Sequence, residues 1–443
     1  MTKIFLYKKF EVSCLKINKV SIKNFRCFDE MSVELNPYVN IIIGNNGAGK
    51  SSLLDAISIG IGSILLGIDG ISSPSIKKDD VRFVSYEVGS IIDRQPQFPV
   101  EIYCEGNLIG QELQWARQLN TENGRTTTSD AVKIKNIASD LQKQIRNGNN
   151  DIALPLISYY GTGRLWAQKR EKQDENRFQI MNRFNGYTDC LSAMSNQKLM
   201  LKWFEKMTLI ELQEKKSLPE LTAVKKAIEE CYQESGTDAQ NVNVYFDVRS
   251  HQLELQYYSK DGECHKHPFH ELSDGYQNTL GLVADIAYRM AQLNPQFLDN
   301  VLKETSGVVL IDEVDLHLHP KWQKYILNTL HKIFPCVQFI VTTHSPSIIS
   351  SANKEHLIIL DHNQCYPYGN EVYGKDVNSI LFEVMETTSR PDEIENMLHE
   401  FDECIDDENI DKAKEILNSL RQKLGDNNKD VITKEITLDF MED

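Results

Sequence analysis

Two patterns of apolar and polar residues predict the strands of this chain. Residues 15–26 and 31–35 alternate apolar and polar side chains with the period of a half-buried strand, so we expect a hairpin there. Short continuous apolar runs instead indicate strands buried on both faces, as in a parallel sheet: 39–43, 307–311 and 337–341. Further strands are predicted at 100–104 and 154–160, and alternation predicts a second hairpin at 241–248 and 252–257.

Other segments repeat apolar residues every three or four positions, which is typical of helices. Residues 199–207 and 221–232 follow this spacing with charges between, so 167–235 is predicted to be a packed helical insertion rather than a binding surface. Near the C-terminus the same spacing predicts helices at 379–386, 393–404 and 409–424.

The stretch Gly44–Ser51 joins the strand at 39–43 to an apolar helix. It fits the pattern G-x-x-x-x-G-K-[ST], in which glycines turn backbone N–H groups toward phosphates at a helix N-terminus. Lys50 is then expected to hold the β- and γ-phosphates and Ser51 to place its hydroxyl on Mg²⁺. Strand, loop and helix stand in the required order, which disfavours a chance glycine turn.

Residues that could complete a nucleotide site occur in the second half of the chain. Asp312 and Glu313 directly follow the buried strand 307–311, so we expect Asp312 to hold Mg²⁺ through water and Glu313 to polarise the attacking water. Ser273 stands at a predicted helix start, where N–H groups and the positive dipole end suit a γ-phosphate. His344 follows another buried strand along the same sheet edge and is a candidate γ-phosphate sensor.

The segment 264–270 contains potential soft metal ligands within seven residues: Cys264, His265, His267 and His270. A transition metal needs such ligands to converge tetrahedrally, whereas Pro268 interrupts a short extended stretch. A polar strand and loop is therefore the favoured interpretation.

Charge is distributed unevenly along the 443 residues. Residues from Ile380 onward include 19 acidic and 7 basic side chains, so this tail carries −12 of the net charge of −16. The balance of −4 in the rest argues against a broad phosphate-binding face over the whole surface. The nine cysteines include no C-x-x-C pair, which favours reduced thiols, and no apolar run reaches the length of a membrane span. We therefore expect a soluble, cytoplasmic protein.

These motifs together resemble a known family of ATPases. The loop 44–51, the segment 272–277, the carboxylates at 312, 313 and 315, and His344 resemble the ATP-binding-cassette ATPases, in their structural-maintenance-of-chromosomes (SMC) and RecF-like form. The segments 24–26 and 342–346 favour that form over a transporter subunit. Residues 159–165 and 316–320 further resemble RecF-like ATPases of bacterial antiphage defence, especially the ATPase subunits of Septu and retron-type systems that act with an HNH endonuclease.

The chain departs from the family pattern at two points. Asp274-Gly275-Tyr276 stands where a transporter-like signature has two glycines before glutamine, so the signature is matched only in part beyond Ser273. The glutamine that the family usually sends to Mg²⁺ has no assigned position in this sequence.

The resemblance implies an α/β fold, an ABC/SMC-type P-loop ATPase head with a helical insertion and a C-terminal α-helical tail. The predicted ATPase core consists of two parts, residues 1–75 and 266–376. Inserted strands and helices lie between them at 76–265, and the acidic tail follows at 377–443. The implied cofactors are ATP and Mg²⁺, with Ser51 and Asp312 at the metal and Glu313 and His344 in catalysis. The implied nucleotide contacts are Asn24, Arg26, Asn45, Asn46, Gly47, Ala48, Gly49, Lys50, Ser51, Ser52, Ser273, Gly275 and Asp315. For Asn24 and Arg26, the residues alone leave a second interpretation open, in which Phe25 packs in the core and its two neighbours are only solvated.

The resemblance also implies a function. We expect hydrolysis of ATP to ADP and phosphate by a homodimer or higher homo-oligomer that controls an HNH nuclease partner, with DNA contact through the complex and no membrane. An alternative is a RecF-like DNA-binding repair or recombination ATPase, which predicts a salt-dependent affinity and a basic groove. A transporter nucleotide subunit is less well supported. A nuclease within this chain is not expected, because the carboxylates after His344 fall on predicted helix surfaces.

The acidic tail suggests a binding role. Its amphipathic helices look too small to form a core of their own, so we expect them to dock on the ATPase body through their apolar stripes. The outward carboxylates would then attract a basic protein and repel DNA. Residues 436–441 are predicted to be a partner-binding peptide.

Overall fold

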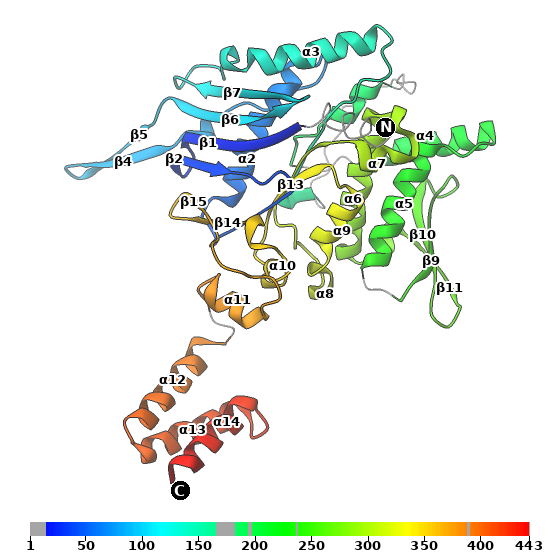
Figure 1. Cartoon of the computed structure of the whole chain (residues 1–443). Coiled ribbons are helices and arrows are strands. Elements are labelled where there is room, and N and C mark those ends of the chain that lie inside the picture. The colour runs from blue at the N-terminus through cyan, green and yellow to red at the C-terminus, as the bar shows by residue number, and fades with distance from the viewer. Residues whose placement is uncertain (1–14, 165–181, 194–196, 236–237, 388–389, 443) are drawn as a thin grey trace, which may run out of the picture. The chain divides into compact units, whose positions relative to one another are not determined.

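The computed structural model describes residues 15–164, 182–193, 197–235, 238–387 and 390–442. The chain divides into two compact units, Met1–Gly374 and Lys375–Asp443, which Figure 1 shows in one view. The division lies two residues from the tail boundary expected at 376–377. The two units are described separately below.

A mostly parallel sheet forms the centre of the first unit (Figure 1). Its strand order among the described residues is β15-β14-β3-β13-β12-β8, and only β15 runs antiparallel to its neighbour. Every residue of the central strands β3, β12 and β13 and of β8 is buried, which explains their continuous apolar sequences. The strands are β3 (Val39–Ile43), β8 (Leu156–Tyr160), β12 (Gly307–Ile311), β13 (Val337–Thr342), β14 (Leu357–Asp361) and β15 (Gln364–Pro367).

An antiparallel sheet, of order β2-β1-β6-β7, lies next to the core sheet. Its strands are β1 (Leu15–Phe25), β2 (Phe28–Glu34), β6 (Val100–Leu108) and β7 (Gln111–Leu119). Because β6 and β7 extend the sheet that β1 and β2 begin, and β8 is an edge of the core sheet, these strands belong to the core. The range 76–265, expected to be an insertion, is thus inserted only in part.

Helix α2 (Lys50–Ile61) packs against both sheets. The indole Nε1 of Trp115 on β7 donates to the carbonyl oxygen of Gly60 at 2.8 Å, which ties the helix to the antiparallel sheet. In the described part of the chain, Lys50–Gly67 is also the one helical stretch long and apolar enough to cross a membrane, but 78% of it is buried inside the unit. Its apolar character is therefore explained by its position between two sheets.

The remaining elements of the first half lie around this core. Helix α3 (Val132–Arg146) crosses outside the antiparallel sheet, and a hairpin projects from the unit in Figure 1, formed by β4 (Phe83–Val88) and β5 (Ile91–Pro96). The helical region contains α4 (Gln197–Glu214) and α5 (Pro219–Glu234); residues 165–181, expected to be helical, lie outside the described residues. A further sheet contains β9 (Gln240–Asp247), β10 (Gln252–Tyr258) and β11 (Cys264–Pro268).

A buried polar network fixes helix α6 (Asp274–Leu293) to the edge strand β8. The Tyr160 hydroxyl and the Arg289 Nε both donate to Asp285 Oδ2, each at 2.7 Å. Burial of both charged groups makes their pairing necessary, so the network sets the position of the helix that starts after Ser273. The shorter helices of this unit are α7 (Val301–Glu304), α8 (Pro320–Gln323), α9 (Ile326–Ile333) and α10 (Pro346–Ile349).

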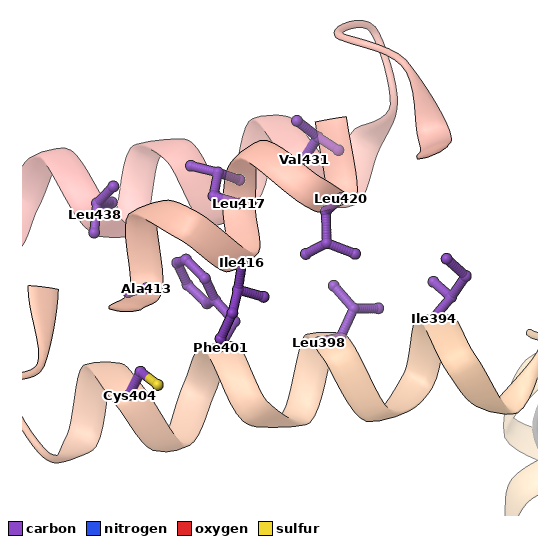
Figure 2. Packing of buried hydrophobic residues seen from close by; sticks show 10 residues of the cluster. All are labelled: Ile394, Leu398, Phe401, Cys404, Ala413, Ile416, Leu417, Leu420, Val431 and Leu438. Carbon is purple, nitrogen blue, oxygen red and sulfur yellow. The ribbon is translucent and has the colours of Figure 1, made fainter. Parts of the chain in front are cut away.

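The second unit is helical and has a hydrophobic core of its own, shown in Figure 2. Its helices are α11 (Val377–Glu383), α12 (Asp392–Asp406), α13 (Ile410–Leu424) and α14 (Lys429–Glu442). The buried cluster joins α12, α13 and α14 through Ile394, Leu398, Phe401, Cys404, Ala413, Ile416, Leu417, Leu420, Val431 and Leu438.

The tail therefore differs from the sequence-based expectation in two ways. The apolar stripes of α12 and α13 pack on each other, so the expectation that they need the ATPase body for their burial is wrong. Residues 436–441, expected to be a peptide, belong to α14, which adds Val431 and Leu438 to the core.

We predict that Phe401→Ala unfolds the tail and leaves the first unit folded. Phe401 is fully buried in the cluster, and removing such a ring costs about 3–5 kcal/mol, which a unit this small cannot easily absorb. Hydrogen exchange should show lost protection in α12–α14 and unchanged protection in the core sheet. Ile436→Ala, at a half-exposed position, is the matched control and should change neither. Simultaneous loss of protection in both units would contradict two independent cores.

Candidate functional site

The loop after β3 has the geometry of a phosphate cradle. Gly49 has φ = 103°, and a Cβ there would lie 2.6 Å from Cys27 Sγ and 2.9 Å from Phe28 Cζ, so only glycine fits. Helix α2 begins at the next residue, with its unpaired N–H groups at the loop. Asn45, Asn46 and Gly47 are exposed, while Ala48 and Gly49 are partly covered, so the loop is accessible from solvent.

Lys50 lies beneath this loop. Its side chain is buried, and Nζ donates to the carbonyl oxygens of Gly44 at 2.8 Å and Asn45 at 3.0 Å. Burial lowers the pKa of Lys50, and the nearby charges of Asp312, Glu313 and Asp315 partly offset that effect. The ammonium is therefore held between the loop and a group of carboxylates, where a bound phosphate would meet it.

The carboxylates lie at the end of β12, directly beside the ends of its neighbours. Ile311 pairs with Tyr160 of β8 and Val341 of β13, so the next residue, Asp312, emerges at the edge where those strands also end. Asp312 Oδ1 accepts from the Thr342 hydroxyl at 2.7 Å, and Asp315 Oδ1 accepts from the Thr343 hydroxyl at 2.6 Å. The end of β13 thereby holds Asp312 and Asp315.

His344 lies in the same electrostatic environment. Burial and then the charge of Lys50 lower its pKa, whereas Asp315, Glu313 and Asp312 act in the opposite direction. The pKa is thus held below its usual value, which favours the neutral imidazole. A neutral ring has one N–H donor and one acceptor, which suits a contact to a phosphate without adding charge.

Oxygen ligands at this edge fit a magnesium ion. The Ser51 hydroxyl is exposed in the first turn of α2, and Asp312 supplies a carboxylate. Within the described ranges, no group of three or more His, Cys, Asp and Glu residues could hold a metal. Mg²⁺ commonly takes one or two protein oxygens together with substrate phosphates and water, so this small set suits it.

Residues 264–270 fall on β11 and the short turn after it. The rings of His265 and His267 lie 6.3 Å apart and nearly parallel, and both stack against Tyr257. This segment is a polar strand and turn, in keeping with the interpretation favoured from the sequence.

Arg26 is bound to acidic residues next to the start of α2. Its guanidinium pairs with Asp55 at 2.6 Å and Asp80 at 2.8 Å, and its Nη1 lies 3.5 Å from Ser52 Oγ. Burial opposes the charge, but the two carboxylates raise the pKa of Arg26 overall. Arg26, Asp55 and Tyr159 line a cavity of about 470 Å³. A nucleotide contact by Arg26 would therefore be made from an already paired side chain.

Asn24 is placed differently. Its side chain is buried, its Nδ2 donates to the Pro99 carbonyl at 3.0 Å, and its backbone is left-handed, with φ = 53°. These contacts hold the turn before Arg26, and a direct nucleotide contact by Asn24 stays a prediction.

Ser273 and Gly275 mark the start of α6. Ser273 is exposed at the N-cap and makes no side-chain cap bond. A Cβ on Gly275 would lie 2.5 Å from the His317 carbonyl oxygen, so glycine allows close packing against the turn that follows the carboxylates. Asn278 Nδ2 also donates to the Leu316 carbonyl at 2.8 Å. The start of α6 is thus positioned by the loop that begins at Glu313.

Sequence reasoning missed several residues that shape the site. In the sequence, Thr342 and Thr343 are only the polar end of an apolar strand. The pairing of β12 with β13 brings their hydroxyls to the carboxylates, and this pairing cannot be read from the sequence. Asp55 and Asp80 gave no sequence signal, because the salt bridges to Arg26 join residues 29 and 54 positions apart.

The chain is similar to several known proteins. A family model described as an AAA domain matches residues 19–235. The "Retron Ec83 probable ATPase" of Escherichia coli is 25% identical over 98% of this chain and 88% of its own. The "Septu protein PtuA" of Bacillus mycoides is 26% identical over 80% of this chain and 41% of its own. Among solved structures, an SMC head bound to the C-winged helix domain of ScpA aligns with a TM-score of 0.46 and 17% identity, covering 81% of this chain and 98% of that one.

The retron relative, which matches nearly the whole chain, is named a probable ATPase. The phosphate loop and the carboxylates lie at one edge of the core sheet, as in a phosphate-loop ATPase. The prediction of an ATPase made from the motifs is therefore confirmed: the chain is an ATPase, and over most of its length it is similar to the probable ATPase of retron Ec83 and to Septu protein PtuA.

Proposed function

We propose that this ATPase binds Mg²⁺-ATP between two copies of the chain in the cytoplasm and uses hydrolysis to control a basic nuclease partner of the HNH type in antiphage defence. The observation that carries the proposal is the convergence of Lys50, Asp312 and Glu313, with His344, at one edge of the core sheet. The similarity to retron and Septu ATPases supports the defence role.

Each residue of the site has a role that its position supports. The loop N–H groups and Lys50 bind the phosphates, and Ser51 and Asp312 hold Mg²⁺, which supplies charge neutralisation on the phosphate oxygens. Glu313 accepts a hydrogen bond from the attacking water and orients it, and neutral His344 donates to the γ-phosphate. Asp315 is bound by Thr343 and shapes the edge next to them.

A second copy of the chain completes the site. Ser273 is exposed and makes no cap bond in its own chain, and a helix N-terminus of this kind suits a γ-phosphate. In an isologous dimer the phosphate loop of one copy faces Ser273 of the other, so two equivalent composite sites form.

We predict that two inactive variants restore each other. Lys50→Ala and Ser273→Arg should each abolish hydrolysis, because one removes a phosphate contact and the other blocks the opposite half of the site. A mixed dimer keeps one site with intact Lys50 and intact Ser273, so an equal mixture should recover about a quarter of wild-type activity if subunits exchange freely. Steady-state phosphate release measures this.

The matched control mixes Lys50→Ala with Glu313→Gln. Both changes fall on the same half of each site, so every composite site in that mixture carries a defect and no recovery is expected. Full activity of Ser273→Arg alone, or equal recovery in both mixtures, would contradict the dimeric site.

The tail offers a surface for a basic partner. The basic residues Lys412, Arg421, Lys423 and Lys434 are already paired with carboxylates of the same unit. Excess acidic groups remain exposed, including Asp406 at the end of α12 and Asp407 directly after it. On α14, Ile432, Ile436 and Phe440 recur every four residues and are 43%, 50% and 79% exposed. An apolar stripe beside acidic groups suits a partner that is basic where it grips DNA.

We predict that deleting residues 390–443 leaves ATP hydrolysis largely intact but weakens recovery of a co-expressed HNH nuclease in a pull-down. The loss should be larger at low than at high salt, because screening weakens exposed charge pairs. The double variant Ile436→Asp/Phe440→Asp should weaken recovery through loss of the apolar contact.

Ser419→Asp is the control for that variant, since it adds an acidic group to an exposed position of α13 and should leave recovery unchanged. Equal recovery with and without residues 390–443 would remove the tail from partner binding and leave its acidic surface as a solvated one.

A further inference from the structure

The turn after β12 contains an uncommon backbone conformation. Glu313 has φ = 48°, in the left-handed region that residues with a side chain rarely adopt. Such a conformation persists only where the surrounding contacts determine it. The contacts that do so come from the two strands on either side of β12.

Thr342, the last residue of β13, makes most of these contacts. Its hydroxyl accepts from the Glu313 N–H at 2.7 Å and donates to Asp312 Oδ1 at 2.7 Å, and its carbonyl oxygen accepts from the Val314 N–H at 2.9 Å. On the other side, the Asp312 N–H donates to the Tyr160 carbonyl of β8 at 2.8 Å. Thr342 is completely buried, so solvent cannot replace any of these bonds.

The donor count makes the arrangement specific to a hydroxyl. A threonine hydroxyl has one proton to donate and lone pairs to accept with. Here the proton is directed to the Asp312 carboxylate, which makes a strong charge-assisted bond, and a lone pair takes the Glu313 N–H. Valine has the same shape but can do neither.

Thr343 repeats the arrangement one residue later. Its hydroxyl donates to Asp315 Oδ1 at 2.6 Å and accepts from the Ser345 N–H at 3.0 Å, and it is also buried. Each hydroxyl thus donates to one carboxylate of the loop after β12 and accepts from one backbone N–H group, that of Glu313 for Thr342 and that of Ser345 for Thr343.

We infer that Thr342 is a positioning residue for ATP hydrolysis: its hydroxyl fixes the magnesium-binding Asp312 and the water-orienting Glu313 in one rigid turn, and Thr343 does the same for Asp315. This inference rests on the proposed roles of Asp312 and Glu313. Neither threonine touches the nucleotide in this account, because both act through the carboxylates.

The test compares Thr342→Val, which removes the hydroxyl, with Thr342→Ser, which keeps it. Thr342→Val should lower kcat about 10- to 100-fold, the usual effect of losing a residue that orients metal ligands. The affinity for ATP in the absence of Mg²⁺ should change little, because Lys50 and the loop are untouched. Thr342→Ser should restore most of kcat. Thr208→Val is the control, since the Thr208 hydroxyl is buried with no hydrogen-bond partner in the described structure, and it should behave as wild type.

A binding readout separates positioning from folding. The affinity for a fluorescent ATP analogue is measured with Mg²⁺ and with EDTA. The ratio of the two affinities is the gain in affinity that Mg²⁺ provides. Thr342→Val should reduce this gain about tenfold through displacement of Asp312, whereas Thr342→Ser and Thr208→Val should keep it. If Thr342→Val does not fold, Thr343→Val tests the same inference through Asp315 and should lower kcat without changing the KM.

Three results would overturn the inference. Wild-type kcat and wild-type Mg²⁺ gain in Thr342→Val would show that the hydroxyl is dispensable. Equal defects in Thr342→Val and in Thr342→Ser, which keeps the hydroxyl, would show that the hydroxyl alone does not account for the effect. An equal loss of nucleotide affinity with Mg²⁺ and with EDTA would indicate a general structural defect. Glu313→Gln separates this failure from that of the proposed function: if it is inactive while Thr342→Val is normal, only the positioning role fails, and if both hydrolyse normally, the catalytic assignment itself is wrong.

Discussion

The parallel register of the core sheet is the constraint on which the site depends. Strands β3, β13, β12 and β8 lie side by side and end at one edge, so residues separated by up to 300 positions in sequence meet there. The phosphate loop leaves β3, the carboxylates leave β12, and His344 follows β13. A change of register by one residue would turn these side chains to the opposite face and separate them.

Electrostatics and backbone geometry at this edge support each other. The burial that lowers the pKa of Lys50 is partly balanced by the carboxylates that also surround His344. Those carboxylates stay close to the ammonium because buried hydroxyls hold them from the neighbouring strand. The same contacts hold the backbone of Glu313 in its left-handed conformation, and strained residues of this kind tend to occur at functional sites. The loop that begins at Glu313 packs against the start of α6 through the carbonyl groups of Leu316 and His317, so this loop positions both the carboxylates and the helix start beside Ser273.

The sequence predicted the parts of the fold that local pattern determines. The loop 44–51 and the buried strands before Lys50 and Asp312 were visible because motif and apolar run coincide. Pairing between distant segments was not visible, so β6 and β7 were placed in an insertion although they extend the sheet of β1. The hydroxyl contacts of Thr342 were missed for the same reason.

The last helix shows another limit of sequence patterns. In α14, Val431 and Leu438 face the tail core, while Ile432, Ile436 and Phe440 form an exposed stripe. Because apolar residues lie on two faces of this short helix, they do not show the single apolar stripe typical of an amphipathic helix, and residues 436–441 were predicted to be a partner-binding peptide instead. The contacts of Ser273 with a second copy stay a prediction, because they involve a surface that a single chain leaves open.

The central claim is that Lys50 binds nucleotide and Glu313 acts only on the attacking water. Sedimentation velocity of Glu313→Gln with Mg²⁺-ATP, alongside phosphate release, tests it most directly. The account predicts near-normal ATP affinity, hydrolysis reduced about 100-fold or more, and an accumulated ATP-bound dimer, whereas Lys50→Ala should bind no nucleotide and show no ATP-dependent dimer. Hydrolysis at the wild-type rate by Glu313→Gln would contradict the account.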